Sequence, residues 1–361
     1  MPDQSVQHVV VGAIFNGSNE VLLAFRPPTA PQGGLWEFPG GKIEAGESAQ
    51  HALARELQEE IGISVISARP LIRIRHHYHE NQGSKTVLLD VWRVDAFAGK
   101  PFGREGQPVE WVAVKDLVQR HYPAANWPIV NAVRLPSRYL ITPEPSPNTP
   151  EFLYCLERSL RSGRFQHPAL SMDGRVSRTS NALERPSGDT RAAIHGGIRL
   201  VQLRAKTLGE TAYAELARQV LPVCHAYQAQ LILNTSPTLA EEIGADGVHL
   251  DSTQLMSLNQ RPFASSRLSS HPRPWVGASC HNARELAHAS HIGADFAVVS
   301  PVLETPSHPG AQTLGWAGLR ELTALATLPV YALGGMTPRH VTQAYEHGAQ
   351  GIAGISSLWR S

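Results

Sequence analysis

The chain has 361 residues, of which 42% are hydrophobic and 17% charged, proportions that exclude a disordered chain and are typical of folded domains. Its 32 basic and 31 acidic residues give a formal charge of +1, which indicates no surface for a nucleic-acid polymer. The early apolar run from Val9 to Phe15 is too short to cross a bilayer, and the three cysteines show no close spacing, so we expect a cytoplasmic protein without membrane contact. A chain of this length predicts two domains.

The first informative segment is residues 41 to 63, GKIEAGESAQHALARELQEEIGI. Residues 48 to 61 contain no glycine or proline and are rich in Ala, Leu, Glu and Gln, which predicts a helix that ends before Gly62. Three carboxylates of this helix lie at i, i+3 and i+4 and therefore share one face: Glu56, Glu59 and Glu60. Like charges at this spacing repel, so the segment is either a solvated acidic surface or a site neutralised by a hard divalent cation, Mg²⁺ or Mn²⁺.

The same segment fills every fixed position of the pattern G-x(5)-E-x(7)-R-E-U-x-E-E-x-G-U, in which U is apolar. The sequence WEFPGGKIE places a tight backbone turn, Pro39-Gly40-Gly41, at its start. This motif resembles the Nudix box, the signature of hydrolases that cleave a nucleoside diphosphate linked to another group. The stretches LWEFPGGKIEAGES, RELQEEIGI, GREGQPVEW and YPAANWPIV extend the resemblance over roughly residues 5 to 135 to the MutT-type branch, which hydrolyses 8-oxo-dGTP to the monophosphate and pyrophosphate.

The resemblance implies a metal site and the residues around it. The implied ligands of Mg²⁺, or of Mn²⁺, are the carbonyl of Gly40 and the carboxylates of Glu56, Glu59, Glu60 and Glu105. Arg55 is implied to orient the glutamates through charge-assisted hydrogen bonds, and Glu47 to support the loop or to assist as a base. Glu56 and Glu60, with Arg55 and Glu47, are therefore the implied catalytic group of this domain.

For the nucleotide, the resemblance implies that Asn126 reads the purine edge and that Phe38 and Arg26 line the pocket. An ordinary core position for Phe38 and an ordinary turn position for Asn126 are the alternatives. The segment HHYHENQGSK, residues 76 to 85, departs from the family pattern where a base-contacting strand and loop would lie. Its histidines could bind a metal, although an exposed strand end is the simpler interpretation: His76, His77 and His79.

After Leu135 the pattern changes to short apolar strands that alternate with helices. RYLIT, residues 138 to 142, is the first predicted strand, and a proline-rich connector follows it at residues 143 to 150. The other predicted strands are Ile198–Arg204, Gln230–Asn234, Gly247–Leu250, Trp275–Cys280, Phe296–Pro301, Pro329–Gly334 and Gly351–Ser356.

This alternation predicts a (β/α)₈ barrel. The expected fold class is therefore α/β, with a Nudix α/β/α sandwich at residues 1–135 and a TIM barrel at residues 136–361. Residues 164 to 194 are rich in Arg, Ser, Pro and Gly and interrupt the alternation. We expect them to form a mobile insertion, with a partner-binding loop as the alternative.

In such a barrel, chemistry takes place at the carboxyl ends of the strands. The polar or glycine residues at those positions are Gln202, Arg204, Lys206, Asn234, His249, Ser279, His281, Gly334, Gly335 and Ser356. Gly-Gly after strand seven and GISS after strand eight are typical of a phosphate pocket, and Arg204 with Lys206 could hold a second phosphate. These segments resemble thiamine-phosphate synthases and the TenI-type thiazole tautomerases over roughly residues 136 to 361.

The departures from the synthase pattern concern its Mg²⁺ ligands. Thr235 and Gln254 stand where the synthases have aspartates, and SHPG replaces a lysine-containing loop. Loss of both carboxylates should remove most of the Mg²⁺ affinity, whereas the resemblance to the TenI branch implies proton transfer by His281. The barrel would then be a tautomerase, a binding module for a thiazole phosphate or thiamine-related ligand, or a degenerate domain.

Three functions follow from these patterns. The first is hydrolysis of 8-oxo-dGTP, or a related nucleoside triphosphate, to sanitise the nucleotide pool. The second keeps the Nudix chemistry but acts on a thiamine-pathway pyrophosphate, which the fused barrel favours and Asn126 disfavours. In the third, the barrel binds a thiazole phosphate and regulates or localises the hydrolase.

Overall fold

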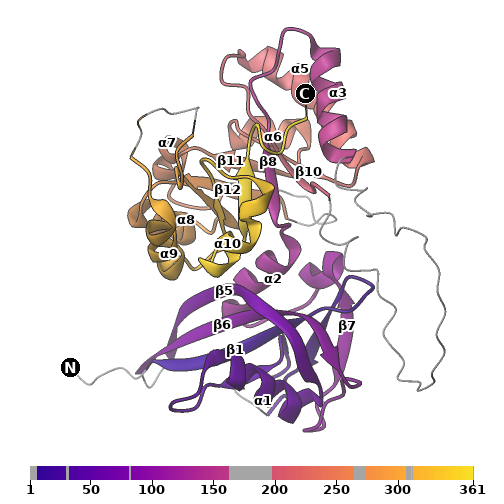
Figure 1. Cartoon of the computed structure of the whole chain (residues 1–361), viewed down its shortest axis with the longest axis vertical. Coiled ribbons are helices and arrows are strands. Elements are labelled where there is room, and N and C mark those ends of the chain that lie inside the picture. Colours follow the sequence, from indigo (N-terminus) through magenta and orange to yellow (C-terminus); the bar gives the residue numbers. More distant parts are fainter. Residues whose placement is uncertain are drawn as a thin grey trace, which may run out of the picture.

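The computed structural model describes residues 6–29, 32–80, 83–161, 197–263, 273–305, 310 and 312–360, with the backbone alone at 78–80 and 83–85. The insertion predicted at residues 164 to 194, most of the SHPG loop and the side chain of His79 lie outside this description. Within the described ranges, no helix combines the length and the apolar character that crossing a membrane requires. Figure 1 shows a strand-rich N-terminal part and a C-terminal barrel, with α2 (Trp127–Arg134) lying between them.

The N-terminal part contains two sheets. Its strands are β1 (Gln7–Ile14), β2 (Glu20–Phe25), β3 (Trp36–Glu37), β4 (Gly40–Lys42), β5 (Ser64–Glu80), β6 (Gly83–Ala98) and β7 (Val109–Ala113). One sheet has the order β4-β1-β6-β5 and the other β3-β2-β7, and β1 and β6 are the parallel neighbours. Short 3₁₀ helices, η1 (Val114–Gln119) and η2 (Ala124–Asn126), lead from β7 into α2.

Alternation along β1 divides its side chains between two helices. Val10 shares a core with Leu57 of α1 (Ala49–Ile61), whereas Val11 shares a core with Ile129 of α2. Successive side chains of a strand point to opposite faces, so each helix covers one face of the sheet. The predicted α/β/α sandwich is confirmed, and the packing of α1 turns its acidic face away from the sheet.

The C-terminal part is a closed barrel of eight parallel strands, as predicted. The strands are β8 (Arg138–Ile141), β9 (Leu200–Leu203), β10 (Gln230–Leu233), β11 (Gly247–Leu250), β12 (Trp275–Cys280), β13 (Phe296–Val299), β14 (Val330–Ala332) and β15 (Gly351–Gly354). Each lies within its predicted range. The helices between them are α3 (Thr149–Arg161), α5 (Glu210–Ala226), α6 (Pro237–Ile243), α7 (Ser252–Ser257), α8 (Ala283–His291), α9 (Gly315–Leu325), and the pair η3 (Pro338–His340) and α10 (Val341–Glu346).

Aromatic side chains fill the interior of the barrel. The ring of Tyr139 lies 5.4 Å from that of Phe296 and 5.6 Å from that of Tyr331, and all three are fully buried. Gly277 leaves room for this packing, because a Cβ there would lie 2.5 Å from the Phe296 ring. The interior is therefore a packed core, and ligands can reach the barrel only at its ends.

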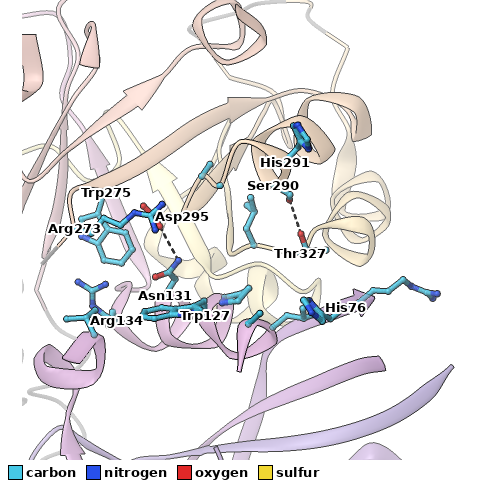
Figure 2. A pocket seen from close by; sticks show the side chains of 18 of the residues that line it. His76, Trp127, Asn131, Arg134, Arg273, Trp275, Ser290, His291, Asp295 and Thr327 are labelled. Carbon is cyan, nitrogen blue, oxygen red and sulfur yellow. Dashed lines mark hydrogen bonds between the residues drawn. The ribbon is translucent and has the colours of Figure 1, made fainter. Parts of the chain in front are cut away.

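The amino-terminal end of the barrel is joined to the first domain. The Gln350 side-chain amide donates to the carbonyls of Ala132 and Leu135, at 2.9 Å each. Asn131 of α2 donates to Asp295 at 3.3 Å, and both residues line a large cavity between the two parts (Figure 2). The carboxyl end of the barrel, where the predicted site residues lie, remains on the opposite side.

Candidate active sites

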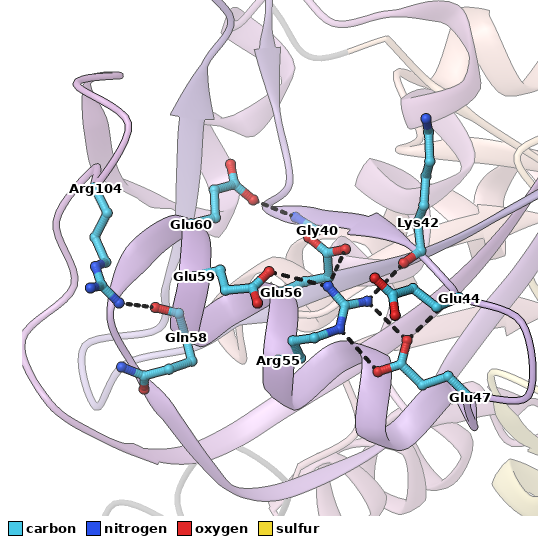
Figure 3. Close-up of polar contacts among 10 residues, drawn as sticks. All are labelled: Gly40, Lys42, Glu44, Glu47, Arg55, Glu56, Gln58, Glu59, Glu60 and Arg104. Carbon is cyan, nitrogen blue, oxygen red and sulfur yellow. Dashed lines mark hydrogen bonds and ion pairs between the residues drawn. The ribbon is translucent and has the colours of Figure 1, made fainter.

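The Gly-Gly turn is held directly against α1 (Figure 3). The backbone N–H of Gly40 donates to the carboxylate of Glu60 at 2.8 Å. A Cβ at Gly40 would lie 2.1 Å from a carbonyl oxygen of β1, and a Cβ at Gly41 would lie 2.0 Å from the carboxylate of Glu56. Glycine at position 40 therefore allows the turn to pack against β1, and glycine at position 41 allows the Glu56 carboxylate to approach the turn.

The Arg55 guanidinium lies at the centre of the acidic face (Figure 3). It donates twice to Glu47, at 2.9 and 3.1 Å, and once each to Glu56 at 2.9 Å and Glu59 at 3.1 Å. Its fifth hydrogen bond, at 3.0 Å, is to the carbonyl of Lys42. Five bonds match the five N–H donors of arginine. The hydrogen bonds to Glu47 and then Glu56 raise the pKa of Arg55, and the same contact lowers the pKa of Glu47.

Glu60 lies in a different electrostatic environment. Its pKa is raised to about 7, mainly by burial and also by the carboxylates of Glu37 and Glu105, while hydrogen bonds from the Gly40 N–H and the Gln107 amide act in the opposite direction. Gln107 fastens the loop that carries Glu105, since its amide donates to the Glu60 backbone carbonyl at 3.3 Å and accepts from the Glu105 N–H at 3.0 Å. The surrounding groups therefore leave negative charge at Glu60 uncompensated.

Two residues of this environment are absent from the sequence prediction, Glu37 and Gln107. Glu37 is a single carboxylate in the apolar stretch LWEF, and burial raises its pKa although Arg26 donates to it. A single carboxylate in an apolar stretch next to the Gly-Gly turn is the sequence feature that could have identified Glu37 as part of the site. Gln107 has no comparable signal, because only the folded loop brings it to the end of α1.

The structure does not assemble the predicted ligands into a coordination geometry. Across the described residues, no group of three or more His, Cys, Asp or Glu side chains is placed to hold a metal ion. Glu56 and Glu59 accept hydrogen bonds from Arg55 instead. The donor set nevertheless fits a hard divalent cation, because its side-chain atoms are carboxylate oxygens and Glu60 carries uncompensated charge.

The three residues predicted to contact the nucleotide lie in different environments. Arg26 forms an ion pair with Glu37, and Phe38 is only 3% exposed and stacks on Tyr122 with ring centroids 6.2 Å apart. Asn126 is half-buried at the start of α2, but its side chain makes no capping hydrogen bond. Its amide therefore remains available to a ligand, whereas Phe38 offers almost no surface.

In the barrel, the predicted phosphate pocket lies at the carboxyl ends of two neighbouring strands. β14 and β15 pair directly, so the loops that carry Gly335 and Ser356 leave the barrel side by side. Gly335 has a φ of 65°, and a Cβ there would lie 2.6 Å from the Glu304 carbonyl. On β9, Gln202 is 3% exposed, and its side-chain oxygen has no partner within the described residues. A buried acceptor of this kind is usually satisfied by a ligand or water.

The two cations predicted to bind a second phosphate are organised by a carboxylate that the sequence prediction missed. Glu144, in the proline-rich connector, accepts from the Arg204 guanidinium at 3.0 Å and from the Lys206 backbone N–H at 3.1 Å. Arg204 is therefore already neutralised, and Lys206 is the cation of this pair without a described ion-pair partner. The expected double-cation phosphate site is correspondingly weaker.

Hydrogen bonds within the barrel occupy the remaining polar groups where the synthases carry Mg²⁺ ligands. Asn234 donates to the His249 carbonyl at 2.9 Å. The Asp251 carboxylate accepts from the Gln254 N–H at 2.8 Å, and the Gln254 side chain accepts from the Asp251 N–H at 3.0 Å. Together they form the capping box of α7, so Asp251 is engaged in holding a helix end.

His281 and Glu285 form a polar pair at the carboxyl end of β12. His281 Nδ1 lies 3.0 Å from the Glu285 carboxylate, and the same oxygen accepts from the His281 backbone N–H at 2.7 Å. The His281 side chain is 47% exposed. A carboxylate at Nδ1 favours the tautomer that leaves Nε2 as an acceptor facing solvent.

Each of the two parts of the chain is similar to known proteins. The family model described as NUDIX domain matches residues 6–133, and the one described as Thiamine monophosphate synthase matches residues 178–358. The 8-oxo-dGTP diphosphatase of Escherichia coli K12 is 36% identical over 122 residues, which cover 34% of this chain and 92% of that protein. The thiamine-phosphate synthase of Nitrosococcus oceani is 35% identical over 171 residues, 47% of this chain and 76% of that protein.

A solved structure from work on MutT of Aliivibrio salmonicida and Vibrio cholerae is 42% identical, covers 36% of this chain and 98% of its own, and has a TM-score of 0.31. The sequence matches, rather than this score, establish the relationship. The N-terminal match supports nucleotide pyrophosphohydrolase activity in the broad sense. The chain thus belongs both to the Nudix hydrolases, through residues 6–133, and to the thiamine monophosphate synthase family, through residues 178–358.

Proposed function

We propose that residues 1–135 form a domain that hydrolyses 8-oxo-dGTP to the monophosphate and pyrophosphate with Mg²⁺, and that residues 136–361 form a separate thiazole-phosphate-binding domain. The observation that carries the first proposal is that glutamates of the predicted metal site lie on both sides of the Gly-Gly turn. Arg55 holds Glu47, Glu56 and Glu59 on one side, and Glu60 contacts Gly40 on the other. The similarity to the 8-oxo-dGTP diphosphatase supports the choice of substrate.

The residues that would hold Mg²⁺ are Glu56, Glu59, Glu60 and Glu105, with the carbonyl of Gly40. When bound, Mg²⁺ would supply positive charge to phosphoryl oxygens of the substrate. Binding requires the Glu60 carboxylate to be ionised, and its pKa of about 7 makes that ionisation dependent on pH near neutrality.

The attacking water must lose a proton to a carboxylate of this cluster. Glu47 is poorly suited to accept it, because two hydrogen bonds from Arg55 lower the pKa of Glu47. We therefore assign Glu47 a positioning role, in which it holds the Arg55 guanidinium. The proton acceptor is then a carboxylate on the Glu60 side of the site, where burial and like charge favour protonation.

Turnover of a substrate panel tests this function. The full-length protein with Mg²⁺ should convert 8-oxo-dGTP with a higher kcat/KM than dGTP and should leave thiamine pyrophosphate intact. A preference for thiamine pyrophosphate would instead establish the second hypothesis, in which the two domains serve one pathway.

For the barrel, the His281–Glu285 pair favours proton transfer over thiamine phosphate synthesis. The carboxylate nearest to the missing Mg²⁺ ligands, Asp251, caps α7, which leaves little to bind a pyrophosphate-linked metal. We therefore propose metal-independent tautomerisation of a thiazole phosphate, with the phosphate held near Gly335 and Ser356. Robust Mg²⁺-dependent formation of thiamine phosphate by the full chain would refute this assignment.

A further inference from the structure

A cavity of about 650 Å³ lies between the first domain and the amino-terminal end of the barrel. Its walls come from β5, β6 and α2 on one side and from the starts of β9, β10 and β12 on the other. The volume is within the range of small-molecule sites. The predicted metal site lies elsewhere, since α1 covers the opposite face of the Nudix sheet, and the barrel loops that carry Gly335 and Ser356 are at the other end of the strands. The residues predicted to contact the nucleotide do not line this cavity either: Arg26, Phe38 and Asn126.

The charge of this cavity is strongly unbalanced. Its cationic lining residues are Arg69, Arg93, Lys115, Arg134 and Arg199, and no Asp or Glu is among the described residues that line it. Arg93 donates to Asp95 at 2.7 Å, and Arg199 donates to the carbonyl of Tyr227. For the other three, no ion pair with a carboxylate occurs within the ranges that the structure describes.

Two arginines of the first domain stack on aromatic rings of the barrel. Arg69 lies 3.8 Å from the ring centroid of Tyr345, and Arg134 lies 4.4 Å from that of Trp275. Figure 2 shows Arg134 beneath Trp275 at one edge of the neighbouring larger cavity, which both residues also line. Stacking uses the faces of the guanidinium groups and leaves N–H donors at their edges for a ligand, although one nitrogen of Arg69 also donates to the Pro70 carbonyl at 3.2 Å. Burial lowers the pKa of both arginines, and it outweighs the opposing effect of the acidic groups of Tyr345 and Asp95 near Arg69 and of Asp295 near Arg134.

We propose that this cavity binds a small anion with two adjacent phosphate groups, either inorganic pyrophosphate or the diphosphate of a nucleotide. A phosphate group carries a charge of about −1.5 to −2 near neutral pH, so two of them match the three unpaired cations and the partly paired Arg93 and Arg199. The planar guanidinium edges suit the bidentate recognition of phosphate oxygens. Because Arg69 and Arg134 also stack on the barrel, the anion would strengthen the contact between the two domains.

Calorimetric titration of the full-length protein in the presence of a chelator tests the proposal, since the chelator removes metal-dependent binding at the Nudix site. The titrants are pyrophosphate, ADP and orthophosphate. Pyrophosphate or ADP should bind saturably with a stoichiometry near one and raise the unfolding temperature, and orthophosphate should bind at least about tenfold more weakly. The tighter of the two diphosphates identifies the source of the ligand.

Variants then locate the binding. Arg134→Met keeps an apolar chain on Trp275 but removes the charge, and it should weaken diphosphate binding by about tenfold or more. Lys115→Ala changes an exposed side chain that no fold contact requires, and it should weaken binding by about threefold or more even if Arg134→Met proves unstable. Arg158→Met is the matched control, because Arg158 stacks on Tyr154 at 5.8 Å on the outside of the barrel. No saturable diphosphate binding, or equal affinity in Lys115→Ala and the control, would overturn the proposal.

Discussion

Replacing Glu60 with glutamine should make the metal-free protein more stable while it removes hydrolysis. The Glu60 carboxyl has a pKa of about 7 in the folded chain, against an ordinary value of 4.5. The folded state therefore keeps this proton up to higher pH than the unfolded state does. The resulting stability is fully present below pH 4.5 and is lost as the pH rises through 7.

The magnitude follows from the difference in pKa. A shift from 4.5 to about 7 corresponds to about 3 kcal/mol at 1.36 kcal/mol per unit, which the metal-free protein loses between these pH values through Glu60 alone. Glutamine keeps an oxygen that can accept from the Gly40 N–H, so the fold of the turn should persist. Glu60→Gln should therefore be more stable than the wild type at pH 8 by up to about 3 kcal/mol and similar to it at pH 4.5.

Urea denaturation in a chelating buffer at pH 4.5, 6 and 8 measures this difference, and Glu242→Gln on the exposed side of α6 controls for a generic change of one charge. Added Mg²⁺ should stabilise the wild type at pH 8 and leave Glu60→Gln unaffected. Turnover of 8-oxo-dGTP by Glu60→Gln should fall by several orders of magnitude. A pH-independent stability difference, together with near-normal turnover, would show that the Glu60 carboxyl has no raised pKa in the folded chain and is not part of the site.

Three further outcomes are expected. Asn126→Ala should raise the KM for 8-oxo-dGTP much more than that for dGTP, because a paired base-edge contact is worth roughly 1–3 kcal/mol; steady-state kinetics with equal effects on both substrates would make Asn126 a structural residue. His281→Ala should abolish thiazole phosphate tautomerisation, measured by nuclear magnetic resonance without Mg²⁺, and retained tautomerisation would exclude His281 as the proton carrier. His249 is buried and has its pKa lowered to about 3, so stability should fall as the pH drops below 6.5, by about 2 kcal/mol at pH 5. In urea denaturation, the free energy of unfolding of His249→Gln should fall less steeply below pH 6.5 than that of the wild type. An unchanged pH dependence would show that other groups cause the acid sensitivity.

Local sequence signals were sufficient for the architecture. The helix α1 begins after Ser48, whose side chain accepts from the His51 N–H, and it ends at Gly62 with a φ of 72°. Both are short-range effects that residue type predicts directly. The barrel strands are short apolar runs separated by helices, a pattern that also depends on neighbouring residues only. The motif order therefore identified the two families and the glutamate-bearing helix before any long-range contact was known.

The tertiary structure decided the electrostatic state of the predicted residues. The sequence predicted Arg204 to be a phosphate ligand, yet its guanidinium donates to the carboxylate of Glu144, which lies 60 residues away in the chain and neutralises its charge. Glu59 and Glu60 are adjacent in the chain, but one accepts from Arg55 and the other is buried beside Glu105. Charge balance and burial depend on which distant side chains the fold brings within a few ångströms, and no local pattern contains that information.

The interdomain cavity is a second case in which the sequence gives the charges but only the fold determines where they gather. The formal charge of +1 for the whole chain indicated no surface for a nucleic-acid polymer and gave no sign of a local cluster of cations. Folding nevertheless gathers Arg69, Lys115 and Arg134 around one cavity, from three separate elements of the first domain. Two of them stack on Tyr345 and Trp275, which follow more than a hundred residues later in the sequence. Net charge averages over all side chains, whereas binding depends on the charges that share a cavity, and only the packing of one domain on the other determines which those are.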